Sequence, residues 1–245
     1  MNTRKLKRLT TIALLAIGLS SCSNETGSDD GNSKFIRITE YPSNSTKENF
    51  HADLTYDNMG RLTLYNEVSD PGVPVFGLSF QYSGADTKPI SAHYDVSDHY
   101  FTYNNAGKLI KDSCITNDGA SLNYTEVKNI SYPSSSLILV NRIVNTSGPI
   151  IRSLDSLTLD SRGNVTASNF YAENSLGNLY LALIRSWEYD DKPNPFGALN
   201  IFPVLQPGFN DIYFSRANNS FLQKNNCLRT TLILYHENGS IIDNN

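Results

Sequence analysis

Nine residues, LTYDNMGRL at positions 54–62, carry the pattern that decides the fold of this 245-residue chain. Leu54 and Tyr56 stand two residues apart, as side chains on one face of a β-strand do. Asp57 can open a type I turn by bonding to its own backbone, and Gly60 can take the positive φ that follows. Leu62 then begins a returning strand. The stretch therefore predicts a β-hairpin.

The same pattern occurs three more times, as FTYNNAGKL at 101–109, LTLDSRGNV at 157–165 and ILYHENGSI at 233–241. The last two copies are less regular, because Leu159 replaces the Tyr and His236 replaces the Asp or Asn. The glycines of the four copies are 47, 56 and 76 residues apart. Solenoids and propellers have nearly constant spacing, so other strands must lie between these hairpins.

Six further segments are rich in β-branched or aromatic residues and are bounded by Gly, Pro, Asn or Ser, which is typical of strands. They are 33–39, 75–82, 90–96, 125–132, 137–144 and 179–189. Short connections between successive strands favour antiparallel pairing. We therefore predict a mainly β fold, an antiparallel meander of about ten to twelve strands that is twisted or partly rolled.

The segment WEYDDKP at 187–193 begins like a fifth copy but has Pro193 where the glycine is needed. Proline cannot take a positive φ, so this hairpin cannot close. Beyond it, Phe209, Ile212, Tyr213 and Arg216 recur at helical spacing, which predicts one or two short helices near residues 196–219. Because a single-layer sheet needs cover for its apolar face, we expect this segment to cap the core.

The first residues have the order of an export signal. Four bases precede an apolar run at 12–19, which is too short to span a bilayer, and residues 1–21 contain no acid. The run ends in LSSC at 19–22, which resembles a bacterial lipobox and predicts lipidation at Cys22. The alternative is a plain secretory peptide in which Cys22 occurs by chance.

We accordingly divide the chain into a lipoprotein signal peptide at 1–21, a flexible acidic tether at 22–33 and a single β-sheet domain at 34–245. The whole chain has a net charge of −4, and removal of the four bases in the signal leaves −8. Nucleic-acid binders need a basic face to replace counterions around phosphate, so we expect no nucleic-acid partner. We expect contact with the membrane through the lipid anchor on Cys22.

Two cysteines remain once Cys22 is acylated. Cys114 and Cys227 form an even pair in an oxidising compartment, which permits a disulfide. The alternative is two separate buried thiols, which behave as small apolar groups.

Motifs with an established catalytic mechanism, such as a nucleophile elbow, a Walker loop or His-Glu-x-x-His, are absent from the sequence. The densest polar set is HYDVSDH at 93–99. On a continuous strand, His93, Asp95, Ser97 and His99 would share one face. A metal site would need a further ligand from elsewhere, so we predict a solvated strand face, with no metal and no cofactor.

Two other sets of residues bear on binding and hydrolysis. A glycosidase needs two carboxylates about 5–10 Å apart, and among the acids Glu126, Asp155 and Glu188 none can be preferred. Trp187 and Tyr189 share a strand face, where they form either a ligand face that stacks on a sugar or part of the core or a sheet edge.

The Tyr-Asp-x-x-Gly-basic-aliphatic unit resembles the Rhs or YD-type repeat. The lipobox, the hairpins, the proline-interrupted segment 187–196, the segment FSRANN at 214–219 and the last hairpin around Gly239 together resemble a family of Bacteroidota lipoproteins of unknown function. The resemblance covers about 34–245. It implies a fold and a place in the outer membrane, on the periplasmic or the cell-surface side, but it implies no activity.

We therefore expect a lipid-anchored envelope protein that is not an enzyme and that binds or scaffolds a glycan, a peptide or another envelope protein. One alternative is a polysaccharide-acting hydrolase whose site the sequence does not locate. Another is a structural subunit that pairs with a partner through its sheet edges. An open aromatic or polar face favours binding, whereas a deep pocket with converging acids favours hydrolysis.

Overall fold

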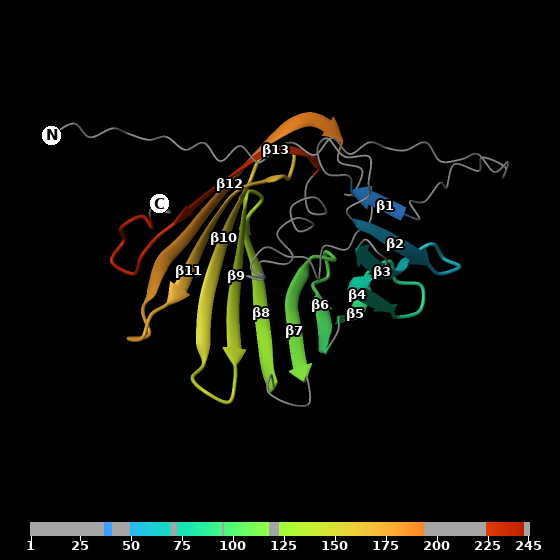
Figure 1. The fold of residues 1–245 in the computed structure, drawn as a ribbon, viewed down its shortest axis with the longest axis horizontal. Helices are drawn as coiled ribbons and strands as arrows, with labels where there is room; N and C mark the ends of the chain where they lie inside the picture. Colours follow the sequence, from blue (N-terminus) through green and yellow to red (C-terminus); the bar gives the residue numbers. More distant parts are fainter. Residues whose placement is uncertain are drawn as a thin grey trace.

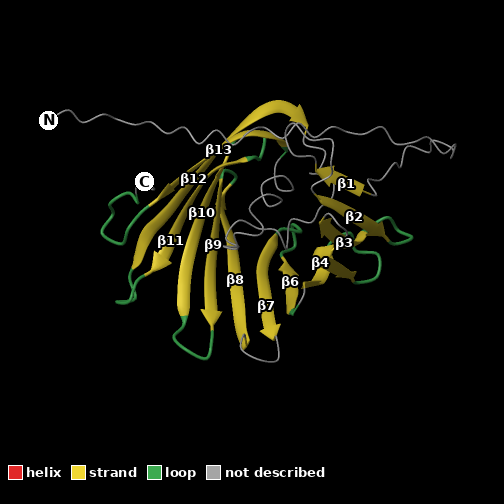
Figure 2. Ribbon diagram, viewed as in Figure 1, coloured by secondary structure: helices red, strands yellow, loops and turns green. Residues whose placement is uncertain are grey.

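The computed structural model describes residues 37–40, 50–69, 73–94, 96–117, 123–193 and 224–242. These residues form one sheet of thirteen strands, in which each strand pairs antiparallel with the next along the chain. The predicted mainly β, antiparallel meander is confirmed, with thirteen strands in place of about ten to twelve. Figure 1 shows the strands in chain order in a single curved and twisted layer, and Figure 2 shows no helix among the described residues.

The strands are β1 (Arg37–Glu40), β2 (Phe50–Tyr56), β3 (Leu62–Ser69), β4 (Val73–Tyr82), β5 (Pro89–Tyr94), β6 (Ser97–Tyr103), β7 (Leu109–Asn117), β8 (Asn123–Ser134), β9 (Leu137–Asn145), β10 (Ile151–Leu159), β11 (Val165–Glu173), β12 (Leu179–Pro193) and β13 (Asn225–Leu234). Within the described part of the chain, β1 and β13 pair only with their sequence neighbours, so the sheet is open. No helix in that part is long and apolar enough to cross a bilayer.

Several expectations fall outside the described residues. They are the signal peptide at 1–21, the tether at 22–33 with Cys22, and the helices near 196–219 with their role as a cap. Strand β12 runs through Trp187 to Pro193. The segment 187–193, which resembles a fifth copy of the hairpin pattern, is therefore strand throughout. It does not close a hairpin, in agreement with Pro193 standing where the glycine is needed.

The predicted hairpin turns all close through the same backbone hydrogen bond. The glycine N–H donates to the carbonyl three residues earlier, at 2.9 Å for Gly60, 2.8 Å for Gly107, 3.1 Å for Gly163 and 2.9 Å for Gly239. All four glycines have a positive φ, between 71° and 89°. A fifth turn of this kind, around Gly177, joins β11 to β12. The sequence analysis missed it because Glu173 stands where the first two copies have Tyr.

Three of the hairpins are also joined to the strand that follows them. In each, a tyrosine hydroxyl donates to the carbonyl of the residue that begins the returning strand. The pairs are Tyr82 Oη to Leu62 O (2.7 Å), Tyr132 Oη to Leu109 O (2.9 Å) and Tyr189 Oη to Val165 O (2.6 Å). Arg61 and Lys108, the basic residues of the first two copies, lie over the rings of Tyr82 and Tyr132, in cation–π contact. The structural repeat is therefore a three-strand unit and not a hairpin alone.

The sheet has two different faces. The core face carries an apolar cluster that extends from β2 to β12 and includes Leu54, Tyr65, Leu78, Phe80, Phe101, Ile130, Val140, Leu157 and Trp187. The open face carries the alternate residues. On β6, Ser97 and His99 are buried on the core face, whereas Asp98 and Tyr100 are exposed on the open face. This alternation places polar residues on both faces of the same strand.

Replacing Gly163 with Ala is expected to lower the free energy of unfolding by about 1 kcal/mol, because its φ of 89° strains an L-residue. An added Cβ would approach only Lys224 Cγ, at 4.0 Å, so no clash contributes. Gly148→Ala is the matched control: its Cβ would meet Thr146 Oγ1 at an ordinary 3.5 Å, and its φ lies outside the left-handed region. Urea unfolding compares the two variants, and equal losses would contradict the requirement for a positive φ.

Candidate functional site

The sequence analysis placed His93 and His99 on one face of a continuous strand, and this expectation is wrong. Strands β5 and β6 form a hairpin in which Tyr94 pairs with Ser97, so the chain reverses between them. The reversal places His93 on the open face and His99 on the core face; Asp95 lies outside the described residues. Among the residues that the structure describes, no three His, Cys, Asp or Glu side chains are arranged to hold a metal ion.

A chain of alternating charges crosses the core face, and we call it the ion network. It consists of His99 on β6, Asp112 on β7, Glu126 and Lys128 on β8, and Arg142 on β9. His99 Nδ1 donates to Asp112 Oδ1 at 3.0 Å, and Arg142 Nη2 donates to Glu126 Oε2 at 2.8 Å. Between them, Lys128 Nζ lies 3.3 Å from Asp112 Oδ2 and 3.3 Å from Glu126 Oε1. The His99, Asp112 and Lys128 side chains are at most 2% exposed.

The strand register explains why these groups meet. Lys128 pairs with Asp112 on one side and with Arg142 on the other. Cys114, two residues after Asp112, pairs with His99 on one side and with Glu126 on the other. Because directly opposed residues, and residues two apart on one strand, share a face, all these side chains point to the core face.

The ion network is charged at neutral pH. Burial opposes ionisation of Asp112, but the positive charge of Lys128 and the hydrogen bond from His99 hold its pKa below the ordinary value. In the same way burial opposes ionisation of Glu126, but Lys128 and Arg142 lower its pKa. Burial acts to lower the pKa of His99, but its bonds to Asp112 and Cys114 outweigh burial and raise the pKa to about 9. Three cations therefore face two carboxylates.

Sequence reasoning singled out His99 and Glu126 of the ion network but not Asp112, Lys128 or Arg142. A signal was present in the strand periodicity. Asp112 and Cys114 are two apart, as are Lys128 and Ile130, so both charges fall in phase with buried apolar positions. A charged residue in phase with the core of a strand needs a partner, and the partner becomes visible only when the register is known.

A second buried carboxylate, Asp155 of β10, lies farther along the core face. Ser168 Oγ of β11 donates to Asp155 Oδ1 at 2.6 Å, and the charge of Arg185 on β12 favours the ionised form. Burial outweighs both and raises the pKa of Asp155 to about 6. This group therefore titrates close to neutral pH.

Trp187 and Tyr189 lie in or against the core. Trp187 is 4% exposed and belongs to the core cluster, and Tyr189 packs against it while its hydroxyl binds Val165. Within the described residues the buried Trp187 indole N–H makes no hydrogen bond. Trp187 therefore serves packing in the core, and Tyr189 is partly buried beside it.

The two cysteines lie on distant strands. Cys114 is a buried free thiol on β7. Cys227 is on β13, six strands farther along the sheet, and its side chain is outside the described residues. The structure therefore holds Cys114 as a thiol and not as half of a disulfide.

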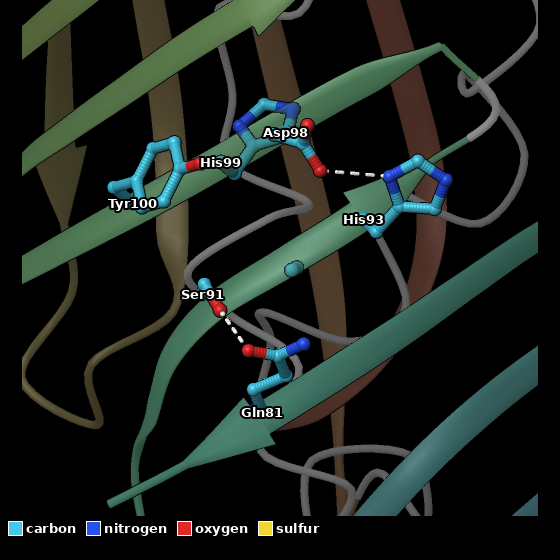
Figure 3. Close-up of a pocket in the computed structure, with 7 residues that line it drawn as sticks. Gln81, Ser91, His93, Asp98, His99 and Tyr100 are labelled. Atoms are coloured by element: carbon cyan, nitrogen blue, oxygen red, sulfur yellow. Dashed lines mark hydrogen bonds and ion pairs between the residues drawn. The ribbon is translucent and has the colours of Figure 1, made fainter.

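The open face has a depression where β4, β5 and β6 lie side by side (Figure 3). Five of its lining residues are Gln81, Ser91, His93, Asp98 and Tyr100. His93 Nδ1 and Asp98 Oδ1 are 2.8 Å apart, and Ser91 Oγ donates to Gln81 Oε1 at 3.3 Å. Tyr100 is 50% exposed. Hydrogen-bonding groups and an aromatic ring thus meet on a surface that solvent reaches, and sequence reasoning found only His93 and Asp98 among them.

Two polar clusters therefore lie back to back on β6: the ion network on the core face and the depression on the open face. Neither a protein-family model nor a curated protein matches the chain. The structure itself shows a mainly β fold with one antiparallel sheet.

Proposed function

We propose that the protein is a lipid-anchored envelope protein that binds glycans in the depression on the open face. The observation that carries this proposal is the grouping of one exposed aromatic ring, Tyr100, with hydrogen-bonding side chains from three adjacent strands. The export signal with its lipobox at Cys22 supports the anchored location. The resemblance to Bacteroidota lipoproteins supports the outer membrane, on its periplasmic or cell-surface side.

The chemistry of the depression suits a sugar. A sugar ring has hydroxyl groups that donate and accept hydrogen bonds at its edge, and a patch of C–H groups on its face. Asp98 accepts hydrogen bonds, Gln81 both donates and accepts, and the Tyr100 ring can cover the C–H patch. The bonds from His93 to Asp98 and from Ser91 to Gln81 order these side chains in advance, which lowers the entropy lost on binding.

The core face gives less support to a hydrolase. A glycosidase needs a protonated carboxyl group with a raised pKa beside an ionised one. Asp112 and Glu126 are both held by Lys128, and both have lowered pKa values, so neither is suited to be a general acid. Asp155 has a raised pKa, but its partners are Ser168 and Arg185. Because none of these carboxylates forms the required pair of a protonated and an ionised group, the core face supports a binding role better than hydrolysis.

Replacing Tyr100 with Ala is expected to weaken glycan binding by about tenfold, the effect of losing one aromatic contact. The full chain is screened on a printed array of neutral and acidic oligosaccharides, and the strongest binder is then titrated by calorimetry. Tyr171→Ala is the matched control, because Tyr171 stands on the open face of β11, five strands away, opposite Leu154. This variant should keep the parent affinity.

Saturable binding without release of reducing ends supports the proposal. If no oligosaccharide on the array binds saturably, or if both tyrosine variants lose affinity equally, the depression is not a glycan site. Release of reducing ends by the full chain would instead favour the hydrolase.

A further inference from the structure

The end of the sheet at which β9, β11 and β13 finish carries exposed apolar side chains that glycan binding does not explain. We call them the apolar rim: Ile150 (49% exposed), Ile151 (48%), Leu176 (80%), Leu179 (48%) and Ile241 (61%). They lie in or beside three connections, 146–150, 174–178 and 236–240, which follow one another along this end in Figure 1. Five described connections lie at the opposite end, and Met59 is the one large apolar side chain that they expose; they are 57–61, 83–88, 104–108, 135–136 and 160–164.

Hydrogen bonds order the apolar rim. Asn174 Oδ1 accepts from the backbone N–H of Leu176 at 3.0 Å, which fixes the tip of this turn. Asn174 Nδ2 donates to Glu237 Oε1 at 2.8 Å and so joins the turn to the last connection. Arg152 Nη1 donates to Glu173 Oε1 at 3.0 Å, which joins the start of β10 to the end of β11. The three connections therefore present their apolar side chains from one linked platform.

We propose that the apolar rim inserts into the surface of a zwitterionic lipid bilayer, with Leu176 at the leading tip. This contact adds to the acyl anchor proposed at Cys22, and it rests on the membrane location in the proposed function. It does not involve the depression, so it is independent of glycan binding.

The apolar side chains surround the end of the sheet. Ile151 pairs with Val144, a buried residue of the core face. Leu179 pairs with Glu173, which is on the open face of β11. Leu176 lies in the turn beyond both faces and is the most exposed of the group. A docked protein covers one side of such a structure, whereas lipid chains surround whatever enters the bilayer, so this distribution favours lipid.

The charges near the rim suit a zwitterionic surface. Arg152 and Glu173 neutralise each other, and the three connections contain one acid, Glu237, and no Lys or Arg. Attraction to anionic lipids requires Lys or Arg, so burial of apolar surface must supply the affinity. Two partly buried tyrosines stand directly behind the rim: Tyr180 follows Leu179, and Tyr235 pairs with Ile241. Tyrosine rings are favoured at the level of the lipid headgroups.

The test uses the full chain with Cys22→Ser, so that no acyl chain holds the protein to lipid. Leu176→Trp places a fluorescent reporter at the tip of the rim, and Met59→Trp is the matched control in an exposed turn at the opposite end. The probe is a phosphatidylcholine vesicle with brominated acyl chains, which quench a tryptophan that enters them. Leu176→Trp is expected to lose most of its added fluorescence, whereas Met59→Trp and the buried native Trp187 should keep theirs.

A second pair of variants, made in the Leu176→Trp chain, tests the rest of the rim. Ile241→Ser should raise the lipid concentration needed for half-maximal quenching by about tenfold, because less apolar surface enters the bilayer. Ile115→Ser is the matched control, since Ile115 is also exposed, at 48%, but stands on the open face of β7 outside the rim. This control should leave the lipid concentration unchanged. Near-ultraviolet circular dichroism checks that each variant keeps its packing.

Three outcomes would overturn the proposal. One is that Leu176→Trp is quenched no more than Met59→Trp. Another is quenching that appears only when anionic phosphatidylglycerol is added to the vesicles. The last is a change in Leu176→Trp emission that depends on protein concentration without vesicles, which would make the rim an interface between copies of this chain. Because no glycan is present, failure of this test leaves the glycan proposal intact, and the reverse also holds.

Discussion

Replacing Lys128 with Met is expected to lower the free energy of unfolding by about 3–5 kcal/mol. The Lys128 side chain is 1% exposed, and its ammonium group lies 3.3 Å from carboxylate oxygens of both Asp112 and Glu126. Without it, two buried carboxylates lose the cation that they share, while water still cannot reach them. Met has a similar length and fills most of the volume, so the loss reports on charge more than on a cavity.

Lys111→Met is the matched control for this prediction. Lys111 is on β7 next to Asp112, but its side chain is exposed on the open face. The change should alter the free energy of unfolding by less than about 0.5 kcal/mol. Urea unfolding at pH 7 measures both variants. A loss below about 1 kcal/mol for Lys128→Met would contradict a dry, closely coupled ion network.

The folded protein is expected to lose about 2 kcal/mol of stability, through Asp155 alone, as the pH rises from 4 to 8. Burial raises the pKa of Asp155 to about 6, so the folded form binds this proton more tightly than the unfolded chain does. Such a group stabilises the fold most below the ordinary pKa of aspartate, near 4. The contribution is lost as the pH rises through about 6, the pKa in the folded form.

Asp155→Asn isolates this contribution, because Asn keeps the shape and the oxygen that accepts the Ser168 hydroxyl but does not titrate. The difference in free energy of unfolding between the parent and this variant, measured in urea at intervals from pH 4 to pH 8, should follow the titration of Asp155.

Ser168→Ala provides a control with a predicted sign. Ser168 donates a 2.6 Å hydrogen bond that favours the ionised carboxylate, so its removal should raise the pKa of Asp155 further and enlarge the pH dependence. If the difference in free energy of unfolding between the parent and Asp155→Asn stays constant between pH 4 and pH 8, the carboxyl group of Asp155 is hydrated in the folded protein.

Local chemistry made the hairpins predictable. Asp57 and Asn104 use side-chain oxygens to accept hydrogen bonds from the backbone of their own turns, and Gly60 and Gly107 supply the positive φ. All of these interactions span four residues or fewer, so they can be read from a short window of sequence. The joining of hairpins by Tyr82, Tyr132 and Tyr189 was not predicted, because each hydroxyl reaches a carbonyl 20 to 24 residues away.

The polar clusters were less predictable because they depend on register. A reversal between Tyr94 and Ser97 moves every later residue of the segment 93–99 to the opposite face from the one expected on a continuous strand. The same reversal brings His93 against Asp98 and turns His99 toward Asp112. Two residues of the depression, Gln81 and Tyr100, come from strands that are not neighbours in the sheet, so no local pattern relates them.

By itself the sequence determined a mainly β, antiparallel meander and the positions of four of its turns, because alternation along a strand and turn chemistry are properties of adjacent residues. The tertiary structure alone decided which strands lie opposite one another, and therefore that Lys128 would stand between Asp112 and Arg142. A charge in a strand has no assigned partner until the register is set. Register follows from the packing of the whole sheet, and it created both the ion network and the depression.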